Sequence, residues 1–171
     1  MANGTLVLGT EVTSSIIHPA RAHLTDFEGR IVKITGYPWW HDHFVFMGTA
    51  QVPLPPGNYR VAVERGPEFR PYNAEFAIRP DKETSITARL EPISHTSLHG
   101  WYSGDLHVHQ PPEDIPLLVQ TENLSIAPVI TWWNSRNYWK DHPLPEESLQ
   151  RSYNGFYHLM AGEDERNGGA F

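Results

Sequence analysis

Cysteine is absent from the 171 residues of this chain. Its absence excludes disulfide bonds, zinc sites built on thiolates and a cysteine nucleophile. The chain also lacks the G-x-S-x-G motif of serine hydrolases, the phosphate-binding P-loop and the glycine fingerprint of dinucleotide-binding folds. These common kinds of catalytic and nucleotide site are therefore not expected.

Runs of positive charge are missing as well, and the formal net charge is −7. A nucleic acid or an acidic membrane surface is therefore not an expected partner. No apolar run approaches the roughly 20 residues that a membrane-spanning helix needs. The opening "MANGTLVLGTEV" has neither the basic start nor the apolar core of a signal peptide. We expect a cytoplasmic protein, or a secreted one whose signal has been removed.

The composition is that of a folded protein, with 39% hydrophobic and 19% charged residues. Short runs of strand-forming residues fill the first 92 positions, with Gly- and Pro-rich turns between them. In residues 59–64, large apolar residues alternate with Arg60, Ala62 and Glu64, as in a sheet with one buried face. Residues 1–92 therefore predict an antiparallel β-sandwich domain. Strands are expected at 5–9, 20–26, 30–34, 43–47, 49–54, 58–66, 74–80 and 84–92.

The pattern changes after Pro92. We expect a strand at 103–109, a helix at 111–124, an apolar strand at 125–133, a short helix at 145–153 and a third strand at 155–162. Alternating strands and helices are typical of a parallel α/β sheet. Residues 100–171 therefore predict a second, α/β domain.

The segment "SGDLHVH" places Asp105, His107 and His109 at every second position. In an extended strand these side chains share one face, while Leu106 and Val108 lie on the other. Burying three titratable side chains without partners on a packed strand costs free energy. A metal site is one arrangement that requires such side chains there. The alternative is that they hydrogen-bond loop backbone at the end of a strand.

"GWYSGDLHVHQPPED" (100–114) resembles the opening motif of the PHP (polymerase and histidinol phosphatase) metallohydrolases, in particular the CehA/McbA-like branch. "LMAGEDERNGG" (159–169) resembles the acidic segment after that family's third strand. "LPPGNYRVAVERGPEFRP" (54–71) resembles the transthyretin-like, carboxypeptidase-regulatory-like sandwich that often precedes such catalytic domains.

The resemblance implies a distorted (β/α) barrel holding one to three divalent metals, zinc foremost and manganese or iron as alternatives. His107, His109 and Glu163 would be metal ligands, and Asp105 would orient a histidine. The catalytic residues would be Asp105 and Glu163. A metal-bound hydroxide would attack an ester or phosphoester of a small-molecule or carbohydrate-like substrate.

The sequence departs from the family at two points. Trp132 and Trp133 stand where the family has an aspartate and a histidine near the metals, and indole is no ligand. About 70 residues follow His99, whereas a (β/α) barrel typically needs ~250 residues. We therefore expect a partial PHP-barrel-like segment, with either a missing C-terminal part or pairing of an open sheet edge in a homo-oligomer.

Two functions follow from these patterns. The first is a metal-dependent hydrolase, or the N-terminal part of one, with substrate contacts at Trp132, Trp133 and Asn134. The alternative is a non-catalytic carbohydrate- or protein-binding module with exposed tryptophans. Its candidate binding residues are Trp39, Trp40, Trp132, Trp133 and Trp139.

Further histidines lie outside the resemblance. In "WWHDHF", His41 and His43 flank Asp42, and a packed aromatic corner is the preferred interpretation, with a separate metal site as the alternative. His142 is a candidate substitute ligand, and His158 a candidate at the strand-end cleft.

Overall fold

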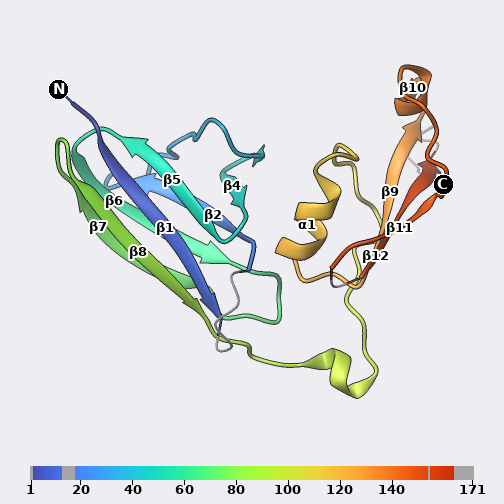
Figure 1. Ribbon diagram of the computed structural model, residues 1–171, viewed down its shortest axis with the longest axis horizontal. Helices are drawn as coiled ribbons and strands as arrows, with labels where there is room; N and C mark the ends of the chain where they lie inside the picture. Colours follow the sequence, from blue (N-terminus) through green and yellow to red (C-terminus); the bar gives the residue numbers. More distant parts are fainter. Residues whose placement is uncertain (1, 13–17, 154, 164–171) are drawn as a thin grey trace. The chain divides into compact units, whose positions relative to one another are not determined.

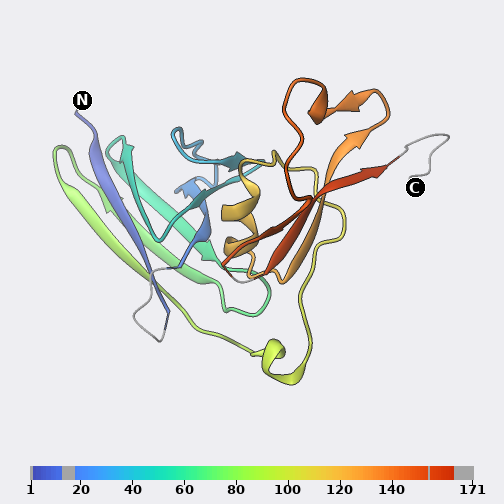
Figure 2. The same cartoon turned by 45° about the vertical axis from the view of Figure 1, so that its right-hand side comes forward.

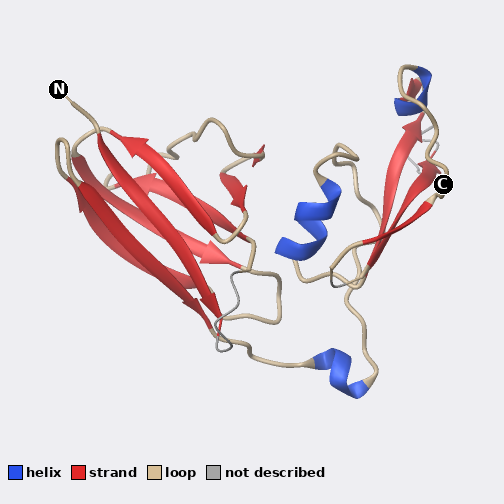
Figure 3. Cartoon of the chain, in the orientation of Figure 1, coloured by secondary structure: helices blue, strands red, loops and turns tan. Residues whose placement is uncertain are grey.

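The computed structural model describes residues 2–12, 18–153 and 155–163. It divides into two compact units, Met1–Thr96 and Ser97–Phe171 (Figures 1 and 3), and each is described by itself. Within the described ranges, no helix has the length and apolar character to cross a membrane.

The N-terminal unit is a β-sandwich (Figure 1). One sheet has the order β5-β1-β8, and the other has the order β3-β4-β2-β6-β7. The strands are β1 (Gly4–Val12), β2 (Ala20–Asp26), β3 (Trp39–Trp40), β4 (His43–Phe46), β5 (Thr49–Leu54), β6 (Gly57–Glu64), β7 (Tyr72–Ile78) and β8 (Glu83–Leu90).

Period-two alternation of apolar side chains builds the core of this sandwich. Along β1, Leu6 and Leu8 are fully buried, and Phe44 and Val63 of the opposite sheet are fully buried in the same cluster. The expected sandwich is present, but it is not wholly antiparallel. Strands β1 and β8 pair in parallel, from Thr5 with Glu83 to Val12 with Leu90.

The strand expected at residues 30–34 is wrong. Ile31 forms a single isolated bridge with Thr25, and Ile34 is buried in the core without belonging to a strand. Val32 and Ile34 therefore pack against the core from a loop, whereas Ile31 is 55% exposed. In addition, β3 forms an edge strand that the sequence did not indicate, in which Trp39 pairs with Phe44 of β4.

The C-terminal unit is a four-stranded mixed sheet of order β10-β9-β12-β11 with one α-helix, α1 (Ile115–Thr121). Its strands are β9 (Ile126–Trp133), β10 (Arg136–Asn137), β11 (Leu149–Arg151) and β12 (Phe156–Glu163), with 3-10 turns at Thr96–His99 and Tyr138–Lys140. Strands β9 and β12 lie side by side in parallel (Figure 2, orange and red). The helix buries Ile115 and Val119 against Ala127, Val129 and Leu159.

The expected fold class is therefore wrong for this unit. Residues 145–153, expected as a helix, contain β11, which pairs antiparallel with β12. The described part of the chain is mostly β, has a single α-helix and contains no α/β PHP barrel. The expected strands at 125–133 and 155–162 and the helix within 111–124 are confirmed, but among the described ladders of this unit only that between β9 and β12 is parallel.

Candidate metal centre

The histidine segment runs beside β9 without forming a regular strand. It makes two isolated parallel bridges, Gly104 with Ile126 and Val108 with Val129. The backbone N–H of Ile130 donates to the carbonyl oxygen of Val108 at 2.7 Å. The strand expected at 103–109 is thus reduced to these two bridges. They hold His107, which lies between them in the sequence, and His109, which follows the second, beside β9.

Glu163 reaches the same region from β12. Because β9 and β12 are parallel, their C-terminal ends meet at one edge of the sheet, and Glu163 is paired with Trp133 there. His109 follows Val108, which is bridged to the middle of β9. The sheet therefore brings together residues that are more than 50 positions apart in the sequence.

Three potential ligand atoms converge at this edge. Nε2 of His107 lies 2.6 Å from Oε2 of Glu163, and Nε2 of His109 lies 2.8 Å from Oε1. The two Nε2 atoms are 3.1 Å apart. Metal bonds of about 2.0–2.1 Å around one ion would put neighbouring ligand atoms roughly 3 Å apart. The three residues thus have the spacing of one face of a coordination polyhedron, and they fit a divalent cation.

The Glu163 carboxylate is buried, with only 4% of its side chain exposed. Its Oε1 atom has no hydrogen-bond partner among the described residues, although His109 is close. A buried carboxylate oxygen without a hydrogen bond is costly. A cation at the point where the three atoms converge would remove that cost.

Asp105 lies outside this cluster. It is exposed, and its Oδ1 accepts a hydrogen bond from the backbone N–H of His107 at 3.0 Å. The carboxylate thus fixes the main chain that carries the first histidine. Its expected role in orienting a ring, and the expected catalytic roles of Asp105 and Glu163, stay predictions.

A hollow of about 420 Å³ borders the cluster. His109 and Trp133 line it, and their rings meet edge to face with centroids 4.9 Å apart. The guanidinium of Arg136 lies 5.5 Å from the Trp133 ring centroid. Tyr138 lines the hollow too; burial and the neighbouring Glu113 carboxylate raise the pKa of its phenol, which therefore remains a hydrogen-bond donor at neutral pH.

The other expected site residues are dispersed. Trp132 is 60% exposed, and Asn134 adopts a left-handed φ of 47° in the turn after β9. His142 stacks on Tyr138, and its Nδ1 lies 2.9 Å from the Tyr138 carbonyl oxygen. His158 accepts a hydrogen bond from the backbone N–H of Met160. Neither histidine joins the three-residue cluster.

Most residues that line the hollow were not foreseen from the sequence, among them Arg136, Asn137 and Tyr138. Their signal was weak, because they belong to β10 and a 3-10 turn, which the polar stretch after Trp133 did not predict. Part of the acidic segment that supported the resemblance, residues 164–169, lies outside the described residues.

Gly104 allows the histidine segment to approach β9 closely. A Cβ at this position would lie 2.6 Å from Cγ2 of Ile126 and 3.2 Å from the Ile126 carbonyl oxygen. We expect Gly104→Val to destabilise the C-terminal unit by about 1–3 kcal/mol through overpacking. Urea unfolding monitored by tryptophan fluorescence measures the change. The matched control is Tyr102→Val, which places a valine in the same segment at a position whose side chain is 73% exposed.

Comparison of the chain with known proteins assigns it to no family. No protein-family model matches the chain, and no curated protein matches it. Among solved structures, the minor pilin GBS52 of Streptococcus agalactiae is similar, with 14% identity and a TM-score of 0.45, over 55% of this chain and 46% of the pilin. A leucine-rich repeat protein of Bacteroides thetaiotaomicron shows 15% identity and a TM-score of 0.29, over 54% of this chain and 14% of its own. Likeness at this level carries no function to this chain.

The PHP resemblance is therefore wrong as a family assignment. No PHP model matches, and the described residues form a mixed sheet rather than a barrel. The hydrolase interpretation depended on that barrel and is withdrawn with it. The alternative of a non-catalytic binding module does not depend on a barrel and stays a prediction.

Proposed function

We propose that this chain is a non-catalytic binding module whose C-terminal unit holds one divalent transition metal at His107, His109 and Glu163. The proposal depends on one observation, the convergence of two imidazole nitrogens and one buried carboxylate within hydrogen-bonding distance of each other. Imidazole and carboxylate together suit zinc, with manganese or iron as alternatives.

The hollow beside the proposed metal site has side chains that suit a sugar-like ligand. A sugar-like ligand would place a flat apolar face against Trp133 and offer oxygen atoms to the metal and to Arg136. Tyr138 and Asn137 add polar groups to the same wall. Three protein ligands leave coordination positions for water or for such a ligand oxygen.

Calorimetric titration with zinc chloride tests the metal site in the full chain carrying Asp42→Asn, a substitution that removes the carboxylate of the other histidine cluster, His23, Asp42 and His43. We expect saturable binding, and a loss of affinity on the order of 100-fold or more in His107→Ala and in His109→Ala, since each removes a ligand. His99→Ala is the matched control, because His99 is exposed in the same unit and outside the cluster. Equal zinc affinity in all three variants would show that the cluster binds no metal.

Tryptophan fluorescence tests the ligand. We expect soluble oligosaccharides to shift the emission of the zinc-loaded chain, and Trp133→Ala to abolish the shift. Trp101→Ala is the control, because Trp101 is 74% exposed and does not line the hollow. Zinc-dependent turnover of a panel of esters and phosphoesters would contradict a non-catalytic role.

A further inference from the structure

A second cluster of ligand-type side chains lies in the N-terminal unit. It consists of His23 on β2, Asp42 in the turn before β4, and His43, the first residue of β4. Nδ1 of His23 lies 3.3 Å from Oδ2 of Asp42, and Nδ1 of His43 lies 3.1 Å from Oδ1. One carboxylate therefore faces two imidazole nitrogens, one at each oxygen.

Strand register and a tight turn create this arrangement. The ladder between β2 and β4 ends with Ala22 paired with Phe44, so the next residues on the two strands, His23 and His43, lie beside each other. Their ring centroids are 5.0 Å apart. The two-residue connection from β3 to β4 places His41 at a φ of 49°, and this turn carries Asp42 back toward both rings.

The remaining nitrogen of His23 supports a metal ligand. Its Nε2 is buried and makes no hydrogen bond within the described residues, while Oε2 of Glu64 lies 3.7 Å away. A neutral imidazole has one N–H and one lone pair. With the proton on Nδ1, the Nε2 lone pair would face the Glu64 carboxylate; with the proton on Nε2, the Nδ1 lone pair would face Asp42.

A cation bound at Nδ1 resolves this conflict. It takes the lone pair and the Asp42 oxygen, and it leaves the Nε2 proton directed toward Glu64. A histidine ligand whose other N–H faces a carboxylate is the usual arrangement around protein-bound metals. Glu64 is held in place by Arg21, whose guanidinium lies 2.6 Å from the same oxygen. A doubly protonated His23 would satisfy both nitrogens without metal and is the competing explanation.

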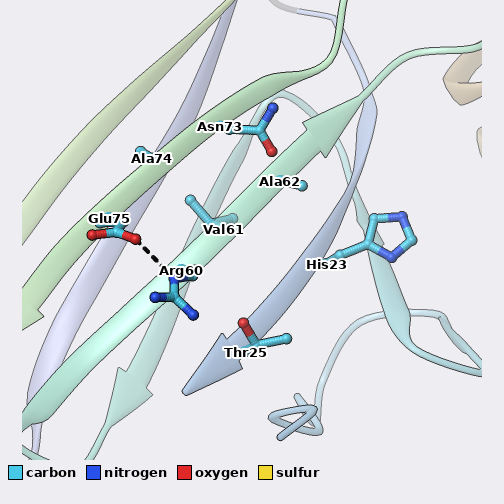
Figure 4. Close-up of a pocket in the computed structure, with 8 residues that line it drawn as sticks. All are labelled: His23, Thr25, Arg60, Val61, Ala62, Asn73, Ala74 and Glu75. Carbon is cyan, nitrogen blue, oxygen red and sulfur yellow. Dashed lines mark hydrogen bonds and ion pairs between the residues drawn. The ribbon is translucent and has the colours of Figure 1, made fainter. Parts of the chain in front are cut away.

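The site is accessible. His23 lies at one end of a hollow of about 300 Å³ on the outer face of the sheet, with Thr25 and the Arg60–Glu75 ion pair further along it (Figure 4). The Asp42 side chain is 49% exposed.

We propose that His23, Asp42 and His43 form a second divalent transition-metal site, next to the outer hollow that His23 lines and independent of the C-terminal centre. Two imidazoles and one carboxylate again favour zinc. A site of this kind gives the sandwich unit a metal-dependent binding role of its own. The inference does not rest on the proposed function, because its residues all belong to the other compact unit.

Cobalt(II) and zinc titrations of a full-length background variant test the site. In His107→Ala/His109→Ala/Glu163→Gln, the C-terminal centre is removed, and we expect one equivalent of metal still to bind. Adding His23→Gln should abolish that binding, and adding Asp42→Asn should weaken it at least tenfold. His41→Asn is the matched control: it removes an imidazole from the same turn, asparagine tolerates its left-handed φ, and binding should be unchanged.

Two titration results would overturn the inference. The first is a background variant that binds no metal although its circular dichroism matches the wild type. The second is metal binding that survives both His23→Gln and Asp42→Asn. Zinc-induced shifts of the imidazole resonances of His23 and His43, followed by NMR in the folded background variant, provide a readout that does not depend on these substitutions. If these resonances do not move, the inference is overturned in favour of a doubly protonated His23.

Discussion

Saturating zinc is expected to raise the free energy of unfolding of the C-terminal unit by about 4 kcal/mol when free zinc exceeds the dissociation constant ~1,000-fold. The reason is that the ligand set exists only when β9, β12 and the histidine segment are assembled. An ion bound by the folded chain alone shifts the folding equilibrium by mass action. Native-state hydrogen exchange of peptides covering β9 and β12 measures the gain.

Glu163→Gln is the informative variant for this prediction. It keeps the size of a side chain that is almost fully buried and removes the only anionic ligand of the described cluster. We expect most of the zinc-dependent protection of β9 and β12 to disappear, because two neutral imidazoles remain. The same gain in Glu163→Gln and in the wild type would mean that zinc stabilises the unit from another position.

Phe44→Ala is expected to destabilise the N-terminal sandwich by about 3–5 kcal/mol. Phe44 is fully buried, packs against Tyr37 and Phe46 with ring centroids 5.4 and 5.7 Å away, and pairs with both Trp39 and Ala22. Its truncation would leave a cavity where two strands meet the core. Such a loss is a large share of the ~5–15 kcal/mol by which a typical domain is stable.

Urea denaturation with fluorescence detection measures this loss, and Met47→Ala is the matched control. Met47 is close in sequence but 54% exposed, so its truncation should change stability by no more than about 0.5 kcal/mol. A difference of under 1 kcal/mol between the two variants would show that the core around Phe44 collapses to fill the space. Because His43 precedes Phe44, the N-terminal metal site should weaken together with the fold.

The sequence predicted most strands of the sandwich because alternation reports burial directly. Tyr59, Val61 and Val63 are all buried, as the alternation over residues 59–64 indicates. Alternation does not report which strands pair or in which direction, so the parallel β1–β8 ladder could not be foreseen. In residues 30–34, a strand was predicted where the structure has a loop. A loop that packs against a core can have the same apolar pattern as a strand.

Three of the candidate site residues lie together in the structure, although the fold predicted around them was wrong. The His-x-His pattern and the acid after an apolar strand identified three residues that the structure brings together, although their metal role stays a prediction. The barrel failed because a short motif constrains only its own segment, and an extended segment beside any parallel strand pair can present the same groups. Hydrophobic spacing over 145–153 could not distinguish a helix from β11, whose short pairing with β12 is a tertiary effect.

The parallel ladder between β1 and β8 has a mechanical consequence. β1 is the first strand of the sandwich along the chain and β8 is the last. The two strands are paired in register from Thr5–Glu83 to Val12–Leu90. Tension applied along the chain would pull these strands lengthwise past each other. Their hydrogen bonds would then share the load and break together instead of opening one by one, which makes this edge of the unit resistant to stretching.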